Sequence, residues 1–156
     1  NGLTEDQFIS CLGDKFDISV SADHKGAKPK KNHEFAFYTN KNWYRFVMKK
    51  ELMTLVDSND PIKNLDVSII QDYVLTPLLN INDQRTDKRV DFVGGIRGLT
   101  ELQNRVDSGD WEAAIALYPT SIESLMSVAD ANKIMPPKST WFEPKLKSGL
   151  FIHMLD

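Results

Sequence analysis

Two short segments of this chain combine residue types that suit the binding of an anion. The first is Val93-Gly94-Gly95-Ile96-Arg97-Gly98, in which glycines let the backbone approach a ligand closely. Free N–H groups at the start of a helix favour negative charge, and a guanidinium binds phosphate or carboxylate through two parallel hydrogen bonds. The candidate ligand-binding residues here are Gly94, Gly95, Arg97 and Gly98. The glycine spacing matches neither the Walker nor the dinucleotide pattern, so a plain strand-to-helix turn is the alternative interpretation.

The second segment is the loop at residues 135–145, Met-Pro-Pro-Lys-Ser-Thr-Trp-Phe-Glu-Pro-Lys. Proline stiffens such a loop, and a stiff loop loses less entropy when it orders around a ligand. The candidate ligand-binding residues here are Lys138, Ser139, Thr140 and Lys145. Two amines and two hydroxyls suit a phosphorylated or carboxylated molecule. The alternative interpretation is an extended connection that aromatic residues pin to the core.

Other residue patterns provide little support for a catalytic or metal-binding site. Ser139 stands outside any G-x-S-x-G motif, so the sequence does not support hydrolase chemistry. There is no H-E-x-x-H motif, and we predict no metal site. The alternative is a magnesium ion that a phosphate ligand brings to one or two of the aspartates Asp87, Asp91, Asp107 and Asp110, which are otherwise ordinary surface carboxylates. The sequence identifies no cofactor. His33 is expected to be solvated, while His153 is either a general base or a hydrogen-bonded structural residue.

Composition restricts the classes of protein to consider. The chain has 156 residues, of which 41% are hydrophobic and 26% charged, as in one globular domain spanning residues 1–156. A net charge of −3 argues against a nucleic-acid partner, and the lysine-rich residues 25–31 are expected to form a solvated loop. No apolar run approaches the ~20 residues that cross a membrane. With no signal peptide visible, we expect a cytoplasmic protein without a membrane partner.

Local patterns predict the elements of the first half of the chain. Thr4 and Gln7 have the spacing of a capping box, and the helix that follows carries Phe8 and Leu12 on one face. Residues 16–20 alternate as in a strand. Residues 34–38 and 43–48, separated by Thr39-Asn40-Lys41-Asn42, predict a β-hairpin. Residues 65–78 have the apolar spacing of an amphipathic helix, which Pro77 should kink or end.

The second half alternates between expected strands and expected helices. Residues 90–93, 113–118 and 149–155 are predicted strands, and helices are predicted after the glycine-rich turn and after Pro119. Thr120 and Glu123 have the spacing of a second capping box. The expected fold is therefore α+β. Its mixed sheet would have an early antiparallel hairpin and a later strand–helix–strand–helix–strand half, with helices mainly on one face.

Two stretches resemble a known family. Residues 135–145 followed by Ser148-Gly149-Leu150, and the upstream residues 111–120 ending in Pro-Thr, are similar to the C-terminal signature of the domain of unknown function 1015 family. The resemblance is good over residues 90–155 and weaker over residues 1–80. It implies a bacterial or archaeal cytoplasmic protein, of which this chain is a C-terminal fragment lacking the N-terminal part. It implies no activity, although the setting of some members suggests serine or phosphoserine as a ligand.

Two functions follow from these patterns, and the sequence leaves both open. In the first, the two segments form opposite walls of a site for a small anionic ligand, phosphate-bearing or amino-acid-like, with phosphoryl transfer as the first reaction to test. In the second, the chain is a non-catalytic structural or interaction module. It would then pack on the missing N-terminal part or on a second copy as a homo-oligomer, with the aromatic hairpin as one contact surface.

Overall fold

The fold is built on one antiparallel sheet. The structure is a computed structural model that describes residues 2–57 and 59–140. Its four-stranded sheet has the order β1–β3–β2–β4, and each neighbouring pair is antiparallel. The strands are β1 (Phe16–Ser21), β2 (Glu34–Thr39), β3 (Asn42–Met48) and β4 (Ala114–Leu117). The helices are α1 (Glu5–Leu12), α2 (His24–Ala27), α3 (Lys50–Leu55), α4 (Asp66–Ile70), α5 (Thr76–Leu79), α6 (Gly98–Asp107) and α7 (Ile122–Asp130), with a π-helical segment η1 (Gln71–Leu75) and a 3₁₀ turn η2 (Gly95–Arg97).

The predicted hairpin is confirmed as β2 and β3. The predicted four-residue turn is wrong: Thr39 pairs with Asn42, so the turn has only two residues, Asn40 and Lys41. Both have positive φ angles, 44° and 65°, as a two-residue turn that matches the twist of its strands requires. This tight turn fixes the register, in which Phe35 of β2 pairs with Phe46 of β3 on one face of the sheet and Tyr38 pairs with Trp43 on the other.

The first face of the sheet carries the larger core. Phe35 and Phe37 of β2 and Phe46 of β3 point to this face and are at most 4% exposed. The Phe37 and Phe46 rings lie 5.4 Å apart between centroids, and Phe8 of α1 stacks on Phe37 at 5.1 Å. The predicted capping box that starts α1 is present, with the Thr4 and Gln7 side chains bonding each other's backbone N–H groups. Helices α1, α3 and α4 cover this face.

The second face carries a smaller cluster under α2 and α6. Tyr38 and Trp43 pack at 4.7 Å between ring centroids, and both give hydrogen bonds to α6. The Tyr38 hydroxyl donates to Asp107 at 2.8 Å, and Trp43 Nε1 donates to Gln103 at 3.1 Å. Helices therefore lie on both faces of the sheet, more of them on the first face. Because both faces are covered, the first five residues of β2 are buried.

The long amphipathic helix predicted at residues 65–78 is confirmed as the continuous run of α4, η1 and α5. Proline lacks a backbone N–H, so Pro77 cannot donate to the preceding turn. The chain adapts with the π-helical segment η1, in which Thr76 N–H bonds the Gln71 carbonyl, and the helix ends at Leu79. Asn80 follows in the left-handed conformation, with a φ of 52°.

The prediction of a mixed sheet is wrong for the described residues. Residues 90–93 form no strand, because their polar groups make local bonds instead. Val90 N–H bonds the Asp87 carbonyl at 3.1 Å, and Phe92 N–H bonds the Asp91 carboxylate at 2.8 Å. The predicted strand at 113–118 is confirmed as β4, but it runs antiparallel to β2. The predicted strand at 149–155 lies outside the described residues.

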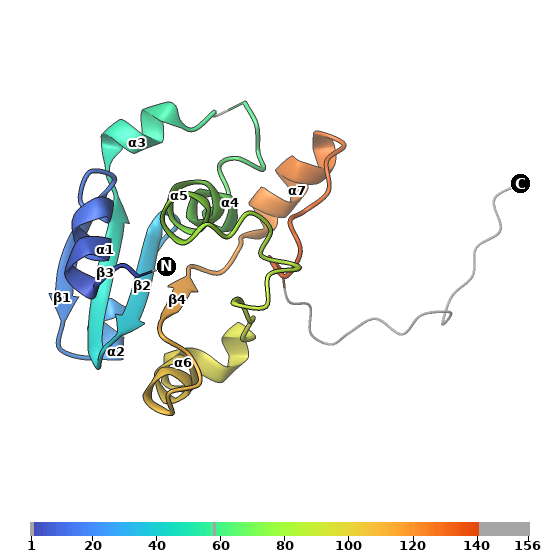
Figure 1. Ribbon diagram of the computed structural model, residues 1–156. Helices are drawn as coiled ribbons and strands as arrows, with labels where there is room; N and C mark the ends of the chain where they lie inside the picture. The colour runs from blue at the N-terminus through green and yellow to red at the C-terminus, as the bar shows by residue number, and fades with distance from the viewer. Residues whose placement is uncertain (1, 58, 141–156) are drawn as a thin grey trace, which may run out of the picture.

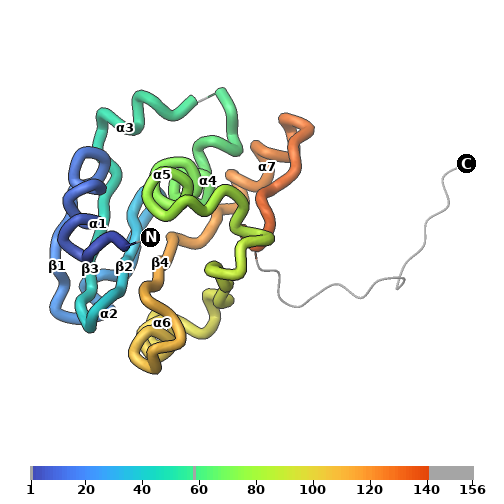
Figure 2. The backbone as a smooth tube through the Cα atoms, viewed as in Figure 1, coloured from blue at the N-terminus to red at the C-terminus, as the bar shows by residue number. Residues whose placement is uncertain are grey.

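The two edges of the sheet have different surroundings. In Figures 1 and 2, β1 borders the sheet on one side and β4 on the other, and α6 and α7 lie on the β4 side. The last described residues, coloured orange-red, also lie on that side. The glycine-rich turn and the 135–140 loop therefore belong to the same half of the molecule.

Candidate functional site

The glycine-rich turn leads into α6. Gly94 precedes η2, and Gly98 has a φ of 72°, a conformation that favours glycine over other residues. The fold therefore explains Gly98 as a turn residue. It does not explain Gly95 in this way, because Gly95 lacks a positive φ and a Cβ added there would meet no atom within 4 Å. The backbone at Gly95 is thus exposed and open to close approach.

The 135–140 loop is held by its own hydrogen bonds. Ser139 Oγ donates to the Pro136 carbonyl at 2.6 Å, so its hydroxyl is already engaged in the turn. Lys138 is exposed and has a φ of 62°, a left-handed conformation that costs a lysine about 1–2 kcal/mol. Thr140 is exposed. Lys145 and His153 lie outside the described residues.

The start of α7 anchors this loop. The Thr120 hydroxyl donates to the Ser139 carbonyl at 2.8 Å. The predicted capping box of Thr120 and Glu123 is therefore wrong. The N-cap is Ser121, whose Oγ accepts from Ser124 N–H at 3.1 Å. The Thr120 hydroxyl is engaged by the Ser139 carbonyl, and the next residue, Ser121, caps the helix instead.

Charges of alternating sign lie next to one another along α6, starting from the first predicted segment. Arg97 reaches Glu101 at 3.5 Å, and Glu101 accepts from Arg105 Nε at 3.0 Å. Arg105 also bonds Asp91 at 2.7 Å. The Phe92 N–H and the bond from Arg105 lower the pKa of Asp91, and the positive charge of Lys138 lowers it further. We call Arg97, Glu101, Arg105, Asp91 and Lys138 the α6 charge network.

A buried ion pair lies in the hairpin, and sequence analysis missed it. Glu34 is 3% exposed. Its carboxylate accepts from Arg45 at 2.8 Å and from Lys30 N–H at 2.9 Å. Burial alone would raise the pKa of Glu34, but the Arg45 and Lys30 bonds and the charge of Lys31 outweigh it and lower the pKa. The signal was present in the sequence, because a glutamate heads an otherwise aromatic strand.

A second buried carboxylate joins the hairpin to α4. Asp66 Oδ1 accepts from His33 N–H at 2.8 Å, while Asp66 Oδ2 is buried without a partner among the described residues. Burial raises the pKa of Asp66 to about 6, against the opposing effects of the N–H bond and the charge of His33. His33 is half-buried and its ring reaches the Asn64 carbonyl at 3.4 Å, so the expectation that it is solvated is wrong.

The buried Asp66 carboxyl should make folding depend on pH. A folded-state pKa of about 6, against an ordinary value of 3.8, means that the native chain binds this proton more tightly than the unfolded chain. The folded state therefore loses stability from this group as pH rises from 4 to above 6, by up to about 3 kcal/mol. Asp66→Asn removes the titration and keeps an acceptor for His33 N–H. Urea unfolding at pH 4 and pH 7 should show the variant gaining this amount relative to the parent chain.

The exposed Asp130→Asn is the matched control. It should track the parent chain at both pH values. A free-energy difference between Asp66→Asn and the parent that stays constant from pH 4 to pH 7 would contradict the assignment.

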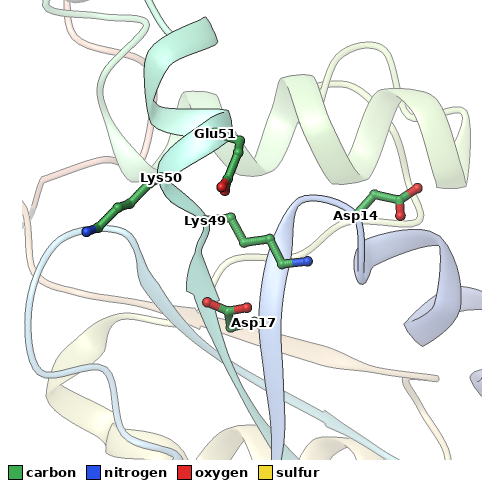
Figure 3. Close-up of a pocket in the computed structure, with 5 residues that line it drawn as sticks. All are labelled: Asp14, Asp17, Lys49, Lys50 and Glu51. Atoms are coloured by element: carbon green, nitrogen blue, oxygen red, sulfur yellow. The ribbon is translucent and has the colours of Figure 1, made fainter.

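One surface depression lies away from the predicted site. It is an open groove of about 550 Å³. The lining residues are Asp14, Asp17, Lys49, Lys50 and Glu51. Figure 3 shows the Lys49 and Lys50 side chains pointing in different directions rather than toward one centre. Lys49 Nζ donates to the Gly13 carbonyl, so it ties the end of α1 to the end of β3.

Neither a metal cluster nor a membrane-spanning helix occurs in the part of the chain that the structure describes. No group of three or more His, Cys, Asp and Glu side chains there is arranged to hold a metal ion. No helix there has the length and apolar character needed to cross a membrane.

Comparison with known proteins gives one match. The family model described as protein of unknown function (DUF1015) matches residues 1–68. No curated protein and no solved structure matches the chain. The match supports the resemblance to this family, but it covers a different part of the chain from the part expected from the sequence. The matched residues include α1, the hairpin and the start of α4, where the resemblance was weaker, and not residues 90–155.

Proposed function

We propose that the chain binds a small molecule bearing a phosphate or carboxylate at the surface between η2 and the 135–140 loop. The supporting observation is the α6 charge network, which extends from Arg97 to Asp91, a residue within electrostatic reach of Lys138. Three cations and two carboxylates make this network positive overall. A ligand anion would supply the charge that balances it.

The geometry favours Arg97 as the first contact. Its side chain is 61% exposed, and its 3.5 Å contact with Glu101 is the longest ion pair of the network. Exposed ion pairs of this kind contribute little to stability, so a ligand can replace the contact at small cost. The open backbone at Gly95 lies in the adjoining turn, and Lys138 would approach from the opposite loop. Among reactions, phosphoryl transfer depends most on such charge neutralisation and positioning.

Ligand-dependent stabilisation tests this function. We expect phosphoserine or inorganic phosphate, but not sodium chloride at equal ionic strength, to raise the Tm. At a hundred times Kd the stabilisation is about 2.7 kcal/mol, which corresponds to roughly 5–10 °C for a domain of this size. Arg97→Gln and Lys138→Gln should each weaken the affinity about tenfold or more, because each removes a charge-assisted contact.

Arg85→Gln is the matched control, since Arg85 is equally exposed, at 62%, and is also paired with a neighbouring carboxylate. It should leave the affinity unchanged. No rise in Tm with any of these ligands, or an equal loss of affinity in Arg85→Gln, would overturn the proposal.

The alternative function is an interaction module, which the outer face of α7 favours. Ile122 and Met126 lie one helical turn apart and are 71% and 58% exposed, and Ile134 beyond the helix is 89% exposed. Exposed apolar residues in one place are typical of a docking surface. The ligand series separates the two functions, because a module of this kind shows no ligand-dependent rise in Tm.

A further inference from the structure

The outer edge of β1 presents backbone groups in a defined phase. β1 borders the sheet and pairs on its inner side with β3 (Figure 1). Lys49 N–H bonds the Lys15 carbonyl at 3.0 Å, and opposed residues of an antiparallel ladder alternate between bonded and non-bonded pairs. The odd-numbered residues of β1 therefore bond β3, and the N–H and C=O groups of Ile18 and Val20 point outward. Within residues 2–57 and 59–140, no hydrogen bond reaches these outward groups.

This edge lacks the features that commonly prevent a border strand from pairing again. The register with β3 runs without interruption from Phe16 to Ser21, so β1 contains no bulge, and it contains no proline. Val20, an apolar residue at this edge, is 72% exposed. A regular and uncovered border strand is a template for a further strand.

The side chains of β1 make this edge complementary to itself. Successive side chains of a strand point to opposite faces, and Phe16 and Ile18 pack with the first core, while Asp17 and Ser19 are exposed on the second face. A two-fold axis perpendicular to the sheet would place a second β1 antiparallel beside the first. Each face of the sheet would then continue into the same face of the second copy, apolar beside apolar and polar beside polar.

Charges of opposite sign flank β1. Lys15 directly precedes the strand, and Asp23 follows two residues after its end. Among the residues that the structure describes, neither side chain belongs to an ion pair. Asp23 Oδ1 accepts from Gly26 N–H at 2.8 Å as the N-cap of α2, which leaves Asp23 Oδ2 to accept from another group. An antiparallel second copy brings the start of each strand to the end of the other, so the opposite charges would meet twice.

We propose that two copies of this chain pair through the outer edges of β1, with Ile18 of one copy opposite Val20 of the other. In this register the outward groups of these two residues bond each other, and Ser19 lies on the two-fold axis. Lys15 of each copy lies opposite Asp23 of the other copy. Opposite charges on paired strands stabilise the pairing.

The charges also select this register over its neighbours. The outward phase allows only shifts of two residues, because bonded and non-bonded pairs alternate. A shift that sets Ile18 opposite Ala22 would place Asp17 opposite Asp23, and like charges directly opposed destabilise the pairing. A shift that sets Ile18 opposite itself would separate Lys15 from Asp23.

Sedimentation velocity over a range of protein concentrations tests the pairing. The parent chain should form dimers as its concentration rises. Val20→Pro should abolish them, because proline removes an outward N–H donor, and an edge strand tolerates proline where that N–H faces solvent. Circular dichroism of the dilute variant shows whether it keeps its fold.

Charge variants test the register and decide the matter if Val20→Pro does not fold. Lys15→Glu should weaken the dimer at least about tenfold, because both contacts with Asp23 become repulsive. Adding Asp23→Asn should restore part of the affinity, since asparagine removes the repulsion and caps a helix as well as aspartate does. Lys25→Glu is the matched control: it makes the same change of charge at an exposed position of α2 and should leave the affinity unchanged.

Hydrogen exchange locates the contact within the dimer. The amides of Ile18 and Val20 should exchange more slowly as protein concentration rises, whereas the amide of Ser19, which bonds β3, should be protected at every concentration. A parent chain that stays monomeric at millimolar concentration would overturn the proposal. So would a dimer whose affinity is unchanged in both Val20→Pro and Lys15→Glu, since the contact would then lie elsewhere, for example at the outer face of α7.

Discussion

Replacing Phe46 by alanine is expected to lower the free energy of unfolding by about 3–5 kcal/mol, the usual cost of removing a buried aromatic ring. Phe46 is 1% exposed, and its ring packs against Phe37 at 5.4 Å and Phe16 at 6.1 Å. The cavity left behind is bounded by strands on both sides, since β3 is an inner strand. The backbone therefore has little freedom to collapse into it. Urea unfolding at neutral pH measures the loss.

Two substitutions make this result specific to the core. Phe46→Leu keeps most of the volume and should cost far less than the alanine change. Val20→Ala lies on the same sheet but at a position that is 72% exposed, and it should change the free energy of unfolding by no more than about 0.5 kcal/mol. A loss for Phe46→Ala no larger than that for Val20→Ala would contradict the position assigned to the aromatic core.

The sequence could predict those parts of the fold that depend on neighbouring residues. The capping box of Thr4 and Gln7, the hairpin of β2 and β3 and the helix that starts after Arg97 each depend on contacts a few residues apart. Such contacts lie within one short stretch of sequence, where a local pattern can reveal them. Pro77 is an instructive case, because its missing N–H was predicted to kink or end the helix, and the structure shows a π-helical segment and an end soon after it.

Features that depend on distant residues were harder to predict. A short apolar run such as residues 90–93 fits a strand or an irregular segment equally well. The bonds of Asp91 to Phe92 N–H and to Arg105 favour the irregular segment. The direction of β4 is set by its pairing with β2, some eighty residues earlier in the sequence. No local pattern contains that information.

The candidate site also combines features that the sequence reveals with features that depend on distant residues. The residue types of the two segments could be chosen from the sequence, because glycine, arginine and lysine carry their chemistry wherever they lie. The carboxylates that pair with basic groups could not be identified from the sequence, since Glu101, Asp91 and Asp66 look like ordinary surface acids there. Their role appears only when α6 and α4 bring them to Arg97, Arg105 and His33. The sequence therefore indicates one partner of each electrostatic contact, and only the fold reveals the other.

Glu34→Ala is expected to cost about 3 kcal/mol of unfolding free energy at neutral pH, at the lower end of the cost of breaking a buried ion pair. The carboxylate is 4% exposed and its partner Arg45 is 29% exposed, so the guanidinium regains some hydration when it is left alone. Arg45 Nε is already buried without a hydrogen-bond partner among the described residues, which limits this recovery. Urea unfolding of Glu34→Ala, Arg45→Ala and the double variant gives the coupling energy between the two side chains.

The pH dependence of these variants identifies the interaction as electrostatic. Because the folded pKa of Glu34 is lowered, the pair stabilises the native state at neutral pH, and this contribution is lost as pH falls through that pKa. In Arg45→Ala the carboxylate stays buried without its cation, so burial should dominate and raise its pKa. Arg45→Ala should therefore recover stability relative to the parent chain as the pH is lowered, whereas the double variant, which lacks both groups, should show neither effect. A loss in Arg45→Ala that is independent of pH would mean that the arginine stabilises the hairpin by packing its aliphatic stem rather than by its charge.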